Sequence, residues 1–452
     1  MDIKIFKNKL FAAAKAAGLS EFELYSKRGT SFEVNIFEGE IDEYKNEKTA
    51  GICFRGKVSG KMGYAYSEKI DDSVIAFLVD SVKQNAAVIE DADEEFIYGG
   101  DTNYPKVEDF NSAIDDIPTE TKIETAMEIE RAAKATDKRV QNLPFCNFTN
   151  VEEDVYIANS LGLELSNKSN GLFGGAFVQV EGADQQVKTA FDCYVGLDFA
   201  KLNPTDLGQK TAKKALANLG ATTVKSGKYA VVFENTAASD MLETWIGAFS
   251  ADNAHKGFSI LAGKLGEKIA TDCITIIDDP LMPAMAATTP FDDEGVASHT
   301  KTVIDAGEFK TFLHNTKTAR KDGVAPTGNG FKFSFKTQIT IAATNFYVKA
   351  GTDSHENLLT KMGDGIVISN VEGLHSGANE TSGDFSLSAT GFLVEGGKVV
   401  RAVEQITISG NFFAMLKDIV AVGSNLEFKS TGSTNNAAAP SLYVKSLDIA
   451  GE

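Results

Sequence analysis

The sequence predicts an α+β protein of two domains, with a mixed α/β N-terminal half and a mostly antiparallel, barrel-like C-terminal half. Its 452 residues are too many for one compact core. Short apolar runs separated by glycine-containing turns recur in both halves, as expected of antiparallel strands. Amphipathic helical segments fall mainly in the first half. We therefore predict one domain over residues 1–222 and a second over residues 223–452.

The N-terminal half is predicted to combine helices with hairpins. Residues 1–20 have helical periodicity, and Asn203-Pro204 supplies a cap and a first-turn proline for a helix that ends before Gly220. Residues 90–120 are acidic and irregular, so we interpret them as a long connection. Residues 171–175 lack the Lys-Ser/Thr pair of a phosphate loop and predict a tight turn. Further helices are expected over 67–87 and 121–135, and strands over 22–25, 31–37, 51–55, 63–66 and within 140–196.

The C-terminal half is predicted to consist mainly of strands that glycines separate. Residues 229–233 form an apolar run that leads into a helix beginning near Asn235. In that helix Met241, Leu242 and Trp245 recur at helical spacing and should pack inward. Few other helices are expected, apart from one over 411–419. Later strands are expected over 308–313, 332–343, 364–370, 385–394, 398–408, 425–428 and 441–444.

Composition and charge restrict the partners and the location. Acidic residues outnumber basic ones by 63 to 44, which gives a net charge of −19. A surface this negative repels a phosphate backbone, so we expect no direct binding of nucleic acid. The four cysteines form no Cys-x-x-Cys pair, which fits a reducing compartment. Lysines interrupt the apolar N-terminus, and no apolar run approaches the ~20 residues of a membrane helix. We therefore expect a cytoplasmic protein without a membrane segment.

The residues alone do not identify a reaction. The sequence has no Gly-x-Ser-x-Gly nucleophile motif. His355-Glu356 lacks the second histidine of a zinc helix, so we expect this dipeptide in a loop. Carboxylates cluster at Asp278-Asp279 and at Asp292-Asp293-Glu294, with His299 nearby in the sequence. Such clusters can bind hard cations, but the same residue types also cap turns. Both interpretations of the acidic residues stay open at this point.

A series of motifs in fixed order resembles the TldD/PmbA family, which is known for modulators of DNA gyrase and regarded as a family of zinc metalloproteases. The resemblance extends to Ala50-Gly51-Ile52 and Ser226-Gly227-Lys228-Tyr229, so it covers essentially the whole chain. The motifs that carry it are Phe291-Asp292-Asp293-Glu294-Gly295, Ile304-Asp305-Ala306-Gly307-Glu308-Phe309, Pro326-Thr327-Gly328-Asn329-Gly330, Thr344-Asn345-Phe346-Tyr347-Val348, Gly373-Leu374-His375-Ser376-Gly377-Ala378-Asn379, Gly383-Asp384-Phe385-Ser386 and Thr407-Ile408-Ser409-Gly410-Asn411.

The resemblance is to the PmbA/TldE branch of the family. The TldD branch has a helix with the sequence His-Glu-x-x-x-His and a later cysteine ligand. Here Glu243 and Ala248 stand at the histidine positions, Thr244 at the glutamate position and Gly373 at the cysteine position. Alanine and glycine have no ligating side chain, and one carboxylate alone cannot hold zinc tightly. The resemblance therefore implies a chain with no metal ligands and no catalytic residue of its own.

The resemblance also implies partners and a substrate class. A TldD-like subunit would hold the zinc and form a heterodimer with this chain, and the pair would enclose a channel for unfolded or extended peptides. The chain in isolation is expected to form a homodimer. Two alternatives stay open: a metallopeptidase whose metal is bound by carboxylates with His299 or His375, and a non-enzymatic regulator of DNA gyrase. The residues expected to face a peptide are Asp292, Asp293, Glu294, Thr327, Gly328, Asn329, Asn345, His375 and Asn379.

Overall fold

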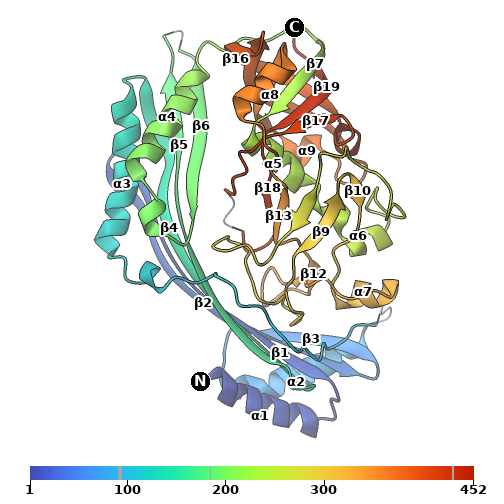
Figure 1. Cartoon of the computed structure of the whole chain (residues 1–452). Helices are drawn as coiled ribbons and strands as arrows, with labels where there is room; N and C mark the ends of the chain where they lie inside the picture. The colour runs from blue at the N-terminus through green and yellow to red at the C-terminus, as the bar shows by residue number, and fades with distance from the viewer. Residues whose placement is uncertain (90–93, 184, 430–431) are drawn as a thin grey trace.

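The N-terminal half is built on one long antiparallel sheet of six strands in the order β3-β2-β1-β4-β5-β6. The computed structural model of the chain describes residues 1–452 except 90–93, 184 and 430–431. Figure 1 shows that the sheet is curved and that the C-terminal half lies on its concave side. The strands are β1 (Phe22–Phe37), β2 (Glu40–Val58), β3 (Lys61–Ser67), β4 (Val140–Asn159), β5 (Glu164–Glu181) and β6 (Val187–Gly196).

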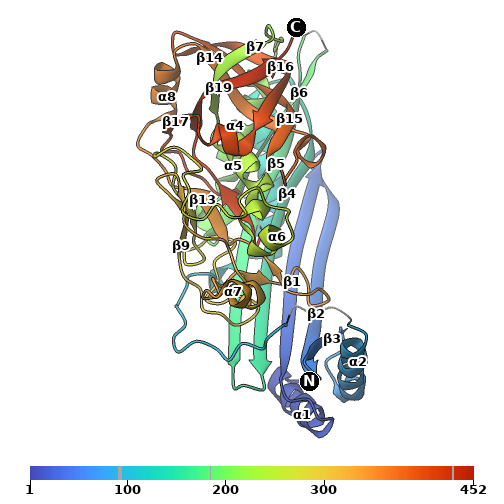
Figure 2. The same ribbon diagram turned by 90° about the vertical axis from the view of Figure 1, so that its right-hand side faces the viewer.

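Helices cover the convex face of this sheet. Two of them, α1 (Ile3–Ala16) and α2 (Ile75–Ala87), pack at the end of the sheet that extends beyond the C-terminal half (Figures 1 and 2). Two more, α3 (Thr119–Thr136) and α4 (Pro204–Ala217), pack at the other end. No helix in the described part of the chain has both the length and the apolar composition that crossing a bilayer requires. Short 3-10 helices are η1 (Asp72–Val74), η2 (Ser112–Ile114) and η3 (Phe199–Lys201).

Strand alternation gives the sheet two different faces. Along β4, Cys146 and Phe148 point to the convex side and pack against α3 and α4 in one apolar cluster. Because successive side chains of a strand point to opposite faces, Phe145, Asn147 and Thr149 point to the concave side. The concave face therefore carries a mixture of aromatic, amide and hydroxyl groups towards the C-terminal half.

The C-terminal half contains a closed barrel of five strands. Their order is β16-β15-β14-β7-β19, and β19 also pairs with β16, which closes the ring. Only β7 and β14 run parallel among these neighbours. The strands are β7 (Gly227–Phe233), β14 (Gly365–Glu372), β15 (Asp384–Glu395), β16 (Lys398–Asn411) and β19 (Leu442–Ala450), and β17 (Ile419–Val422) pairs with β19 outside the ring.

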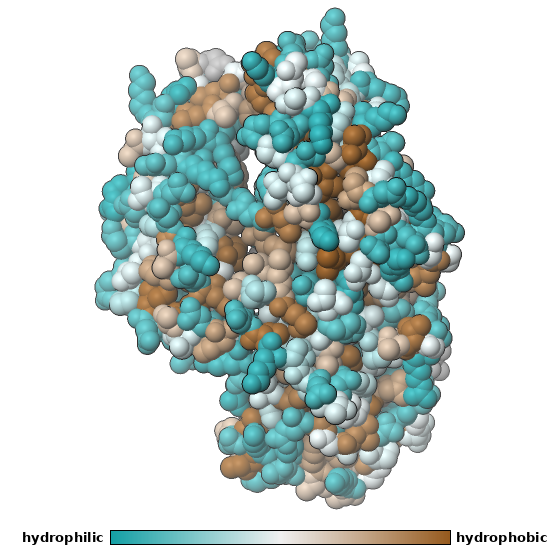
Figure 3. All heavy atoms as spheres, in the orientation of Figure 1, coloured by the Kyte–Doolittle hydropathy of each residue, from teal (hydrophilic) through white to brown (hydrophobic). Residues whose placement is uncertain are grey.

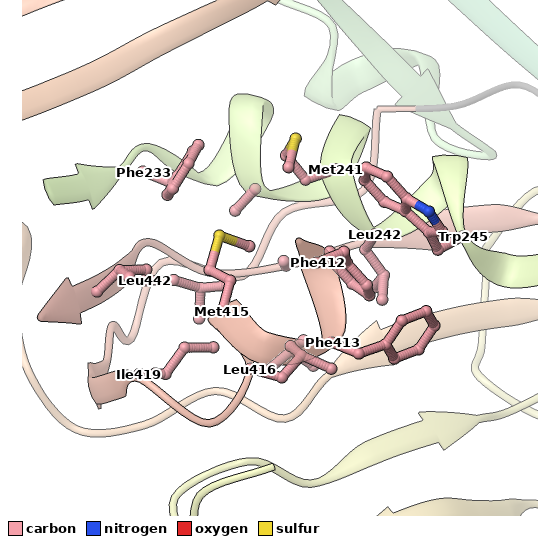
Figure 4. Packing of buried hydrophobic residues seen from close by; sticks show 14 of the residues in the cluster. Phe233, Met241, Leu242, Trp245, Phe412, Phe413, Met415, Leu416, Ile419 and Leu442 are labelled. Carbon is pink, nitrogen blue, oxygen red and sulfur yellow. The ribbon is translucent and has the colours of Figure 1, made fainter. Parts of the chain in front are cut away.

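The largest apolar cluster joins this barrel to the helix that follows β7. The Trp245 indole stacks on Phe412 with ring centroids 4.6 Å apart and an angle of 10° between the planes. Figure 4 shows Leu242 and Trp245 beside Phe412, and Met241 belongs to the same cluster. The helices of this half are α5 (Asn235–Thr244), η4 (Ile246–Phe249), α6 (Ala251–His255), α7 (Thr316–Asp322), α8 (His355–Met362), α9 (Leu374–Gly377) and α10 (Phe412–Met415).

A second sheet lies between the barrel and the N-terminal half, with strand order β10-β9-β8-β13-β18. It carries the loops in which most of the predicted site residues lie. Its strands are β8 (Ile276–Asp278), β9 (Lys301–Asp305), β10 (Glu308–Phe309), β13 (Asn345–Val348) and β18 (Asn436–Ala438), and a separate two-stranded ladder pairs β11 (Gly330–Phe331) with β12 (Thr340–Ile341).

The predicted α+β class with a barrel-like C-terminal half is confirmed. The proposed boundary at residue 222 falls between α4 and β7 and stays a prediction. The irregular connection over 90–120 includes residues 90–93, which lie outside the described residues. In the rest of this connection, the described residues form the short helix η2 and the first residues of α3, and no other helix or strand.

Several predictions for single elements are wrong, and local contacts explain them. Residues 171–175 do not turn but continue β5, where a Cβ at Gly175 would lie 2.5 Å from the Phe173 ring. His355-Glu356 begins α8 rather than a loop, because the Ser354 hydroxyl caps the helix by accepting from the Asn357 N–H at 3.2 Å. The helix α7 was likewise not predicted, and it begins after the capping residue Asn315.

The predicted strands near the second sheet are mostly too long. Residues 308–313 and 332–343 keep only β10 and β12, because a turn with a Thr337 N–H to Ser334 carbonyl hydrogen bond of 2.9 Å interrupts the second run. Residues 425–428 are not a strand, and β18 follows later. The helix predicted over 411–419 is reduced to α10, after which the chain enters β17.

Because β14 and β15 approach closely at Gly391, one methyl group added there should destabilise the fold. A Cβ at Gly391 would lie 1.7 Å from the Val367 carbonyl oxygen, whereas a Cβ at Gly227 would meet no atom closer than Tyr229 Cε2 at 3.7 Å. Gly391→Ala should therefore lower the free energy of unfolding by about 1–3 kcal/mol, and Gly227→Ala should leave it nearly unchanged. Urea denaturation of both variants checks this, and equal stabilities would contradict the barrel packing.

Candidate functional site

The end of α5 and the following η4 occupy the position at which the resemblance would place a zinc helix. Glu243 is exposed on its last turn. The Thr244 hydroxyl donates to the Asp240 carbonyl oxygen at 2.8 Å, so it is used within the helix. Ala248 is 1% exposed and belongs to the apolar core. These three positions therefore present one carboxylate, one hydroxyl that is already bonded and one methyl group.

The chain's own residues do not fit a zinc ion. Protein zinc sites use three or four Cys, His or carboxylate ligands. Within the described residues, no group of three or more His, Cys, Asp or Glu side chains is placed so that it could hold a metal ion. His299 and His375 are both exposed, and Gly373 precedes α9 with a φ of +79° and has no side chain that could bind a metal. No step of a zinc mechanism follows from these residues.

The acidic motif 292–294 is directed into the protein and is hydrogen-bonded there. Asp292 is fully buried and accepts from the N–H groups of Glu294, Val296 and Gly330 at 3.0, 2.9 and 2.8 Å. Glu294 accepts from the Thr316 N–H at 2.7 Å and from its hydroxyl at 2.6 Å. Burial, together with the Glu294 charge, raises the pKa of Asp292 well above its usual value, and burial also raises the pKa of Glu294.

A second buried carboxylate lies at the end of β8. Asp278 is 0% exposed and accepts from the Thr344 N–H and hydroxyl, both at 2.6 Å, and from the Asn329 amide at 2.8 Å. It also pairs with the buried Lys301 ammonium at 2.9 Å. The Thr327 hydroxyl is 2.8 Å from the Asn329 side-chain oxygen, so the motif 326–330 and the carboxylate form one network.

The nine predicted site residues thus separate into two groups. Seven of them, from Asp292 to Asn345, lie in or beside the buried networks, and most of their polar atoms bond to other protein groups. His375 and Asn379 lie apart, exposed at the loop around α9. The Trp245 indole N–H donates to the Asn379 carbonyl oxygen at 3.1 Å and holds this loop against α5. A role of any of the nine in binding a peptide stays a prediction.

A cavity of about 460 Å³ lies between the concave face of the sheet and residues 284–288 of the C-terminal half. Figure 3 shows an opening between the two halves of the molecule. None of the residues that line the cavity was predicted from the sequence as a site residue. The available signal was the alternation along β4, which points every second residue to one face. The residues of β4 in the wall are Phe145, Asn147, Thr149, Val151 and Glu153.

Polar contacts attach the two halves on either side of this cavity. At one end, Lys429 of the C-terminal half and Lys214 of α4 both lie 2.6 Å from the Asp192 carboxylate on β6. Burial alone would raise the pKa of Asp192, but these two ammonium groups lower it to about 2. At the other end, the Tyr104 hydroxyl donates to the Gly295 carbonyl oxygen at 2.8 Å. These contacts hold the two halves of the molecule together.

Comparison with known proteins agrees with this architecture. Models of the PmbA/TldA metallopeptidase match domain 1 over residues 22–86, the central domain over 112–219 and the C-terminal domain over 226–451. The chain belongs to the PmbA/TldD family. It is 26% identical over 445 residues to a metalloprotease PmbA homolog of Haemophilus influenzae, which covers 97% of this chain and 94% of that protein.

Two solved structures of the PmbA/TldD family have the same fold. A Thermotoga maritima protein named as a candidate modulator of DNA gyrase has a TM-score of 0.91 and 34% identity, covering 99% of this chain and 100% of that one. TldE from Thermococcus kodakarensis has a TM-score of 0.90 over 99% of this chain and 100% of that chain. At 22% identity, the second likeness shows the fold alone.

The buried ion pair between Asp278 and Lys301 should contribute strongly to the stability of the fold. Asp278→Asn would leave the buried Lys301 ammonium without its counter-charge, so we expect a loss of about 3–5 kcal/mol in the free energy of unfolding. Asp305→Asn, at the exposed end of β9, is the matched control and should change it by less than about 0.5 kcal/mol. Chemical denaturation measures both variants. A loss as small as that of the control would show that the network is not structural.

Asp240 on α5 should make the stability of the protein depend on pH. Burial and the neighbouring Glu243 raise its pKa to about 6. The folded state therefore binds this proton more tightly than the unfolded chain, and stability falls as pH rises from about 4 to about 6. Asp240→Asn removes this penalty, so its melting temperature should exceed that of the wild type at pH 7.5 but not near pH 3.5. Asp80→Asn, exposed on α2, should show no such trend, and a pH-independent difference for Asp240→Asn would contradict the assignment.

Proposed function

We propose that this chain is the zinc-free subunit of a heteromeric TldD/TldE-type metalloprotease that acts on unfolded or extended peptides. Its relatives carry metalloprotease names, and the family models describe a metallopeptidase. The observation that carries the proposal is the chemistry at the end of α5 and in the following η4, where Glu243, Thr244 and the buried Ala248 occupy the positions of a zinc helix. These side chains cannot assemble a catalytic zinc, so a TldD-like partner would have to supply it.

The interdomain opening supports a role of this subunit in holding the substrate. The concave face presents strands, aromatic rings and amides towards a cavity of about 460 Å³. An extended peptide can bind such a surface, with pockets for alternate side chains. A folded substrate would not enter a space of this size. The subunit would therefore contribute part of a channel, and its partner would contribute the reacting groups.

The proposal includes an assembly and a location. The isolated chain would form a homodimer, because a surface that meets a homologous partner can also meet its own copy. The location would be the cytoplasm, since all four cysteines are free and three of them are buried. The gyrase connection rests on the name of the Thermotoga maritima relative, and the net charge of −19 disfavours a direct contact of this chain with DNA.

Reconstitution with a partner tests the proposal. The partner is a family member from the same genome that has the His-Glu-x-x-x-His helix, and the probe is fluorescein-labelled casein quenched by dense labelling. We expect the two chains to elute together with the mass of a heteromer, and the mixture to hydrolyse casein in a chelator-sensitive way. This chain alone should be inactive. Chelator-sensitive hydrolysis by this chain alone, or no complex with the partner, would contradict the proposal.

A further inference from the structure

We propose that the cavity between β4, β5 and residues 284–288 is a side-chain pocket for an extended peptide, and that it selects an apolar or aromatic residue next to a basic one. This inference rests on the proposed function for its substrate class and adds the preference of the site. Three features of the cavity support it: an apolar wall, an unpaired buried acceptor and an excess of carboxylates.

The apolar wall consists of aromatic rings and a methionine. Phe145 and Phe173 both line the cavity and lie 6.4 Å apart, measured between ring centroids, so the two rings form a continuous surface across β4 and β5. Met285 of the C-terminal half lines the opposite side. Methionine is flexible and polarizable and adapts to side chains of different shape. This wall fits an aromatic or large aliphatic side chain without selecting one of them.

The acceptor is the amide oxygen of Asn147, which lies on the same wall. The residue is 4% exposed, and its Oδ1 has no hydrogen-bond partner among the described residues. Its Nδ2 donates to the Thr149 hydroxyl at 3.3 Å. A buried acceptor without a donor costs about 1–3 kcal/mol. Rotation of this amide into the cavity would bring Oδ1 within reach of a backbone N–H of a bound peptide, which would supply the missing donor.

The carboxylates indicate the charge of the ligand. The described residues that line the cavity include Glu33, Asp109 and Glu153, but no lysine, arginine or histidine. Glu153 is paired with Lys27 at 2.9 Å, and Lys45 lies opposite Glu33 on β2 and interacts with its charge. Asp109 accepts from the Asn167 amide at 2.6 Å, and burial raises its pKa. A basic residue beside the apolar one would therefore meet the Glu33 and Glu153 side of the cavity, whereas an acidic residue would be repelled.

Two backbone features lie at the rim of the cavity, at Gly171 and at Ala284. A Cβ at Gly171 would meet no atom closer than the Gly196 carbonyl oxygen at 4.0 Å, so the space above β5 at this position is free. Ala284 has a φ of +59°, a conformation that costs free energy for a residue with a side chain. Its N–H donates to the Glu108 carbonyl oxygen at 2.8 Å, which holds the strained residue against the N-terminal half. Strain of this kind persists where surrounding contacts fix a loop.

Fluorescence anisotropy of the purified full chain alone tests the pocket. The probe is fluorescein-Gly-Ser-Lys-Phe-Lys-Ser-Gly, compared with peptides in which Ser replaces Phe or Glu replaces both Lys. We expect about tenfold weaker binding without the Phe and about fivefold weaker binding with Glu. Equal affinities for the three peptides, or no saturation up to about 1 mM, would overturn the proposal.

Variants locate the binding in this cavity. Gly171→Leu fills the free space and should weaken binding of the Phe peptide about tenfold, while Gly227→Leu, outside the cavity, should not. The double variant Glu33→Gln/Glu153→Gln should abolish the preference for Lys over Glu but keep the preference for Phe over Ser. Glu43→Gln on the exposed part of β2 is its control. Unchanged selectivity in the double variant would overturn the charge assignment.

Asn147→Leu separates a ligand-binding role from a structural one. Replacement of an unpaired buried amide by an apolar side chain of similar size should keep or raise the melting temperature while it weakens peptide binding. A fall in stability with unchanged binding would show that Asn147 is structural. These measurements use this chain without a partner. If the pocket proposal is wrong, only the anisotropy measurements will contradict it. If the subunit proposal is wrong, only the reconstitution with the partner will contradict it.

Discussion

Carboxylates buried away from water are the constraint on which the C-terminal half depends. Asp278, Asp292 and Glu294 all lie in the interior, and each must receive hydrogen bonds from the protein. The donors come from segments far apart in the sequence, including 314–318, 327–330 and 344–345. This requirement explains why short polar motifs recur around the second sheet. They hold loops in place, and any contact with a peptide would be additional.

Much of the fold could be predicted from local patterns, because helical and strand periodicities depend on neighbouring residues. Met241, Leu242 and Trp245 pack inward as their spacing predicts. The C-terminal half was predicted to be barrel-like, but the strands that close the ring could not be predicted, since the pairing of β16 with β19 depends on distant parts of the chain. The short helices α7 and α8 were missed because one capping residue each, Asn315 and Ser354, decides where they begin.

The candidate site was harder to predict than the fold. Asp, Asn, Thr and Gly serve turns and caps as well as binding sites, so the motif 326–330 could not be assigned from its composition. The structure shows that Thr327 and Asn329 belong to a buried network. The cavity joins β4 with residues 284–288, and no local pattern connects segments so distant. Helices cover the convex face of the sheet, which leaves the concave face as the surface available to a ligand.

The central claim is that this PmbA/TldD-family chain has no zinc site of its own and depends on a partner for catalysis. The zinc content of the chain, purified alone from zinc-containing medium and then dialysed, tests this claim most directly. Elemental analysis should find far less than one zinc atom per chain, because the described residues hold no group of three or more His, Cys, Asp or Glu side chains placed to bind a metal ion. Close to one zinc atom per chain that survives dialysis would contradict the account.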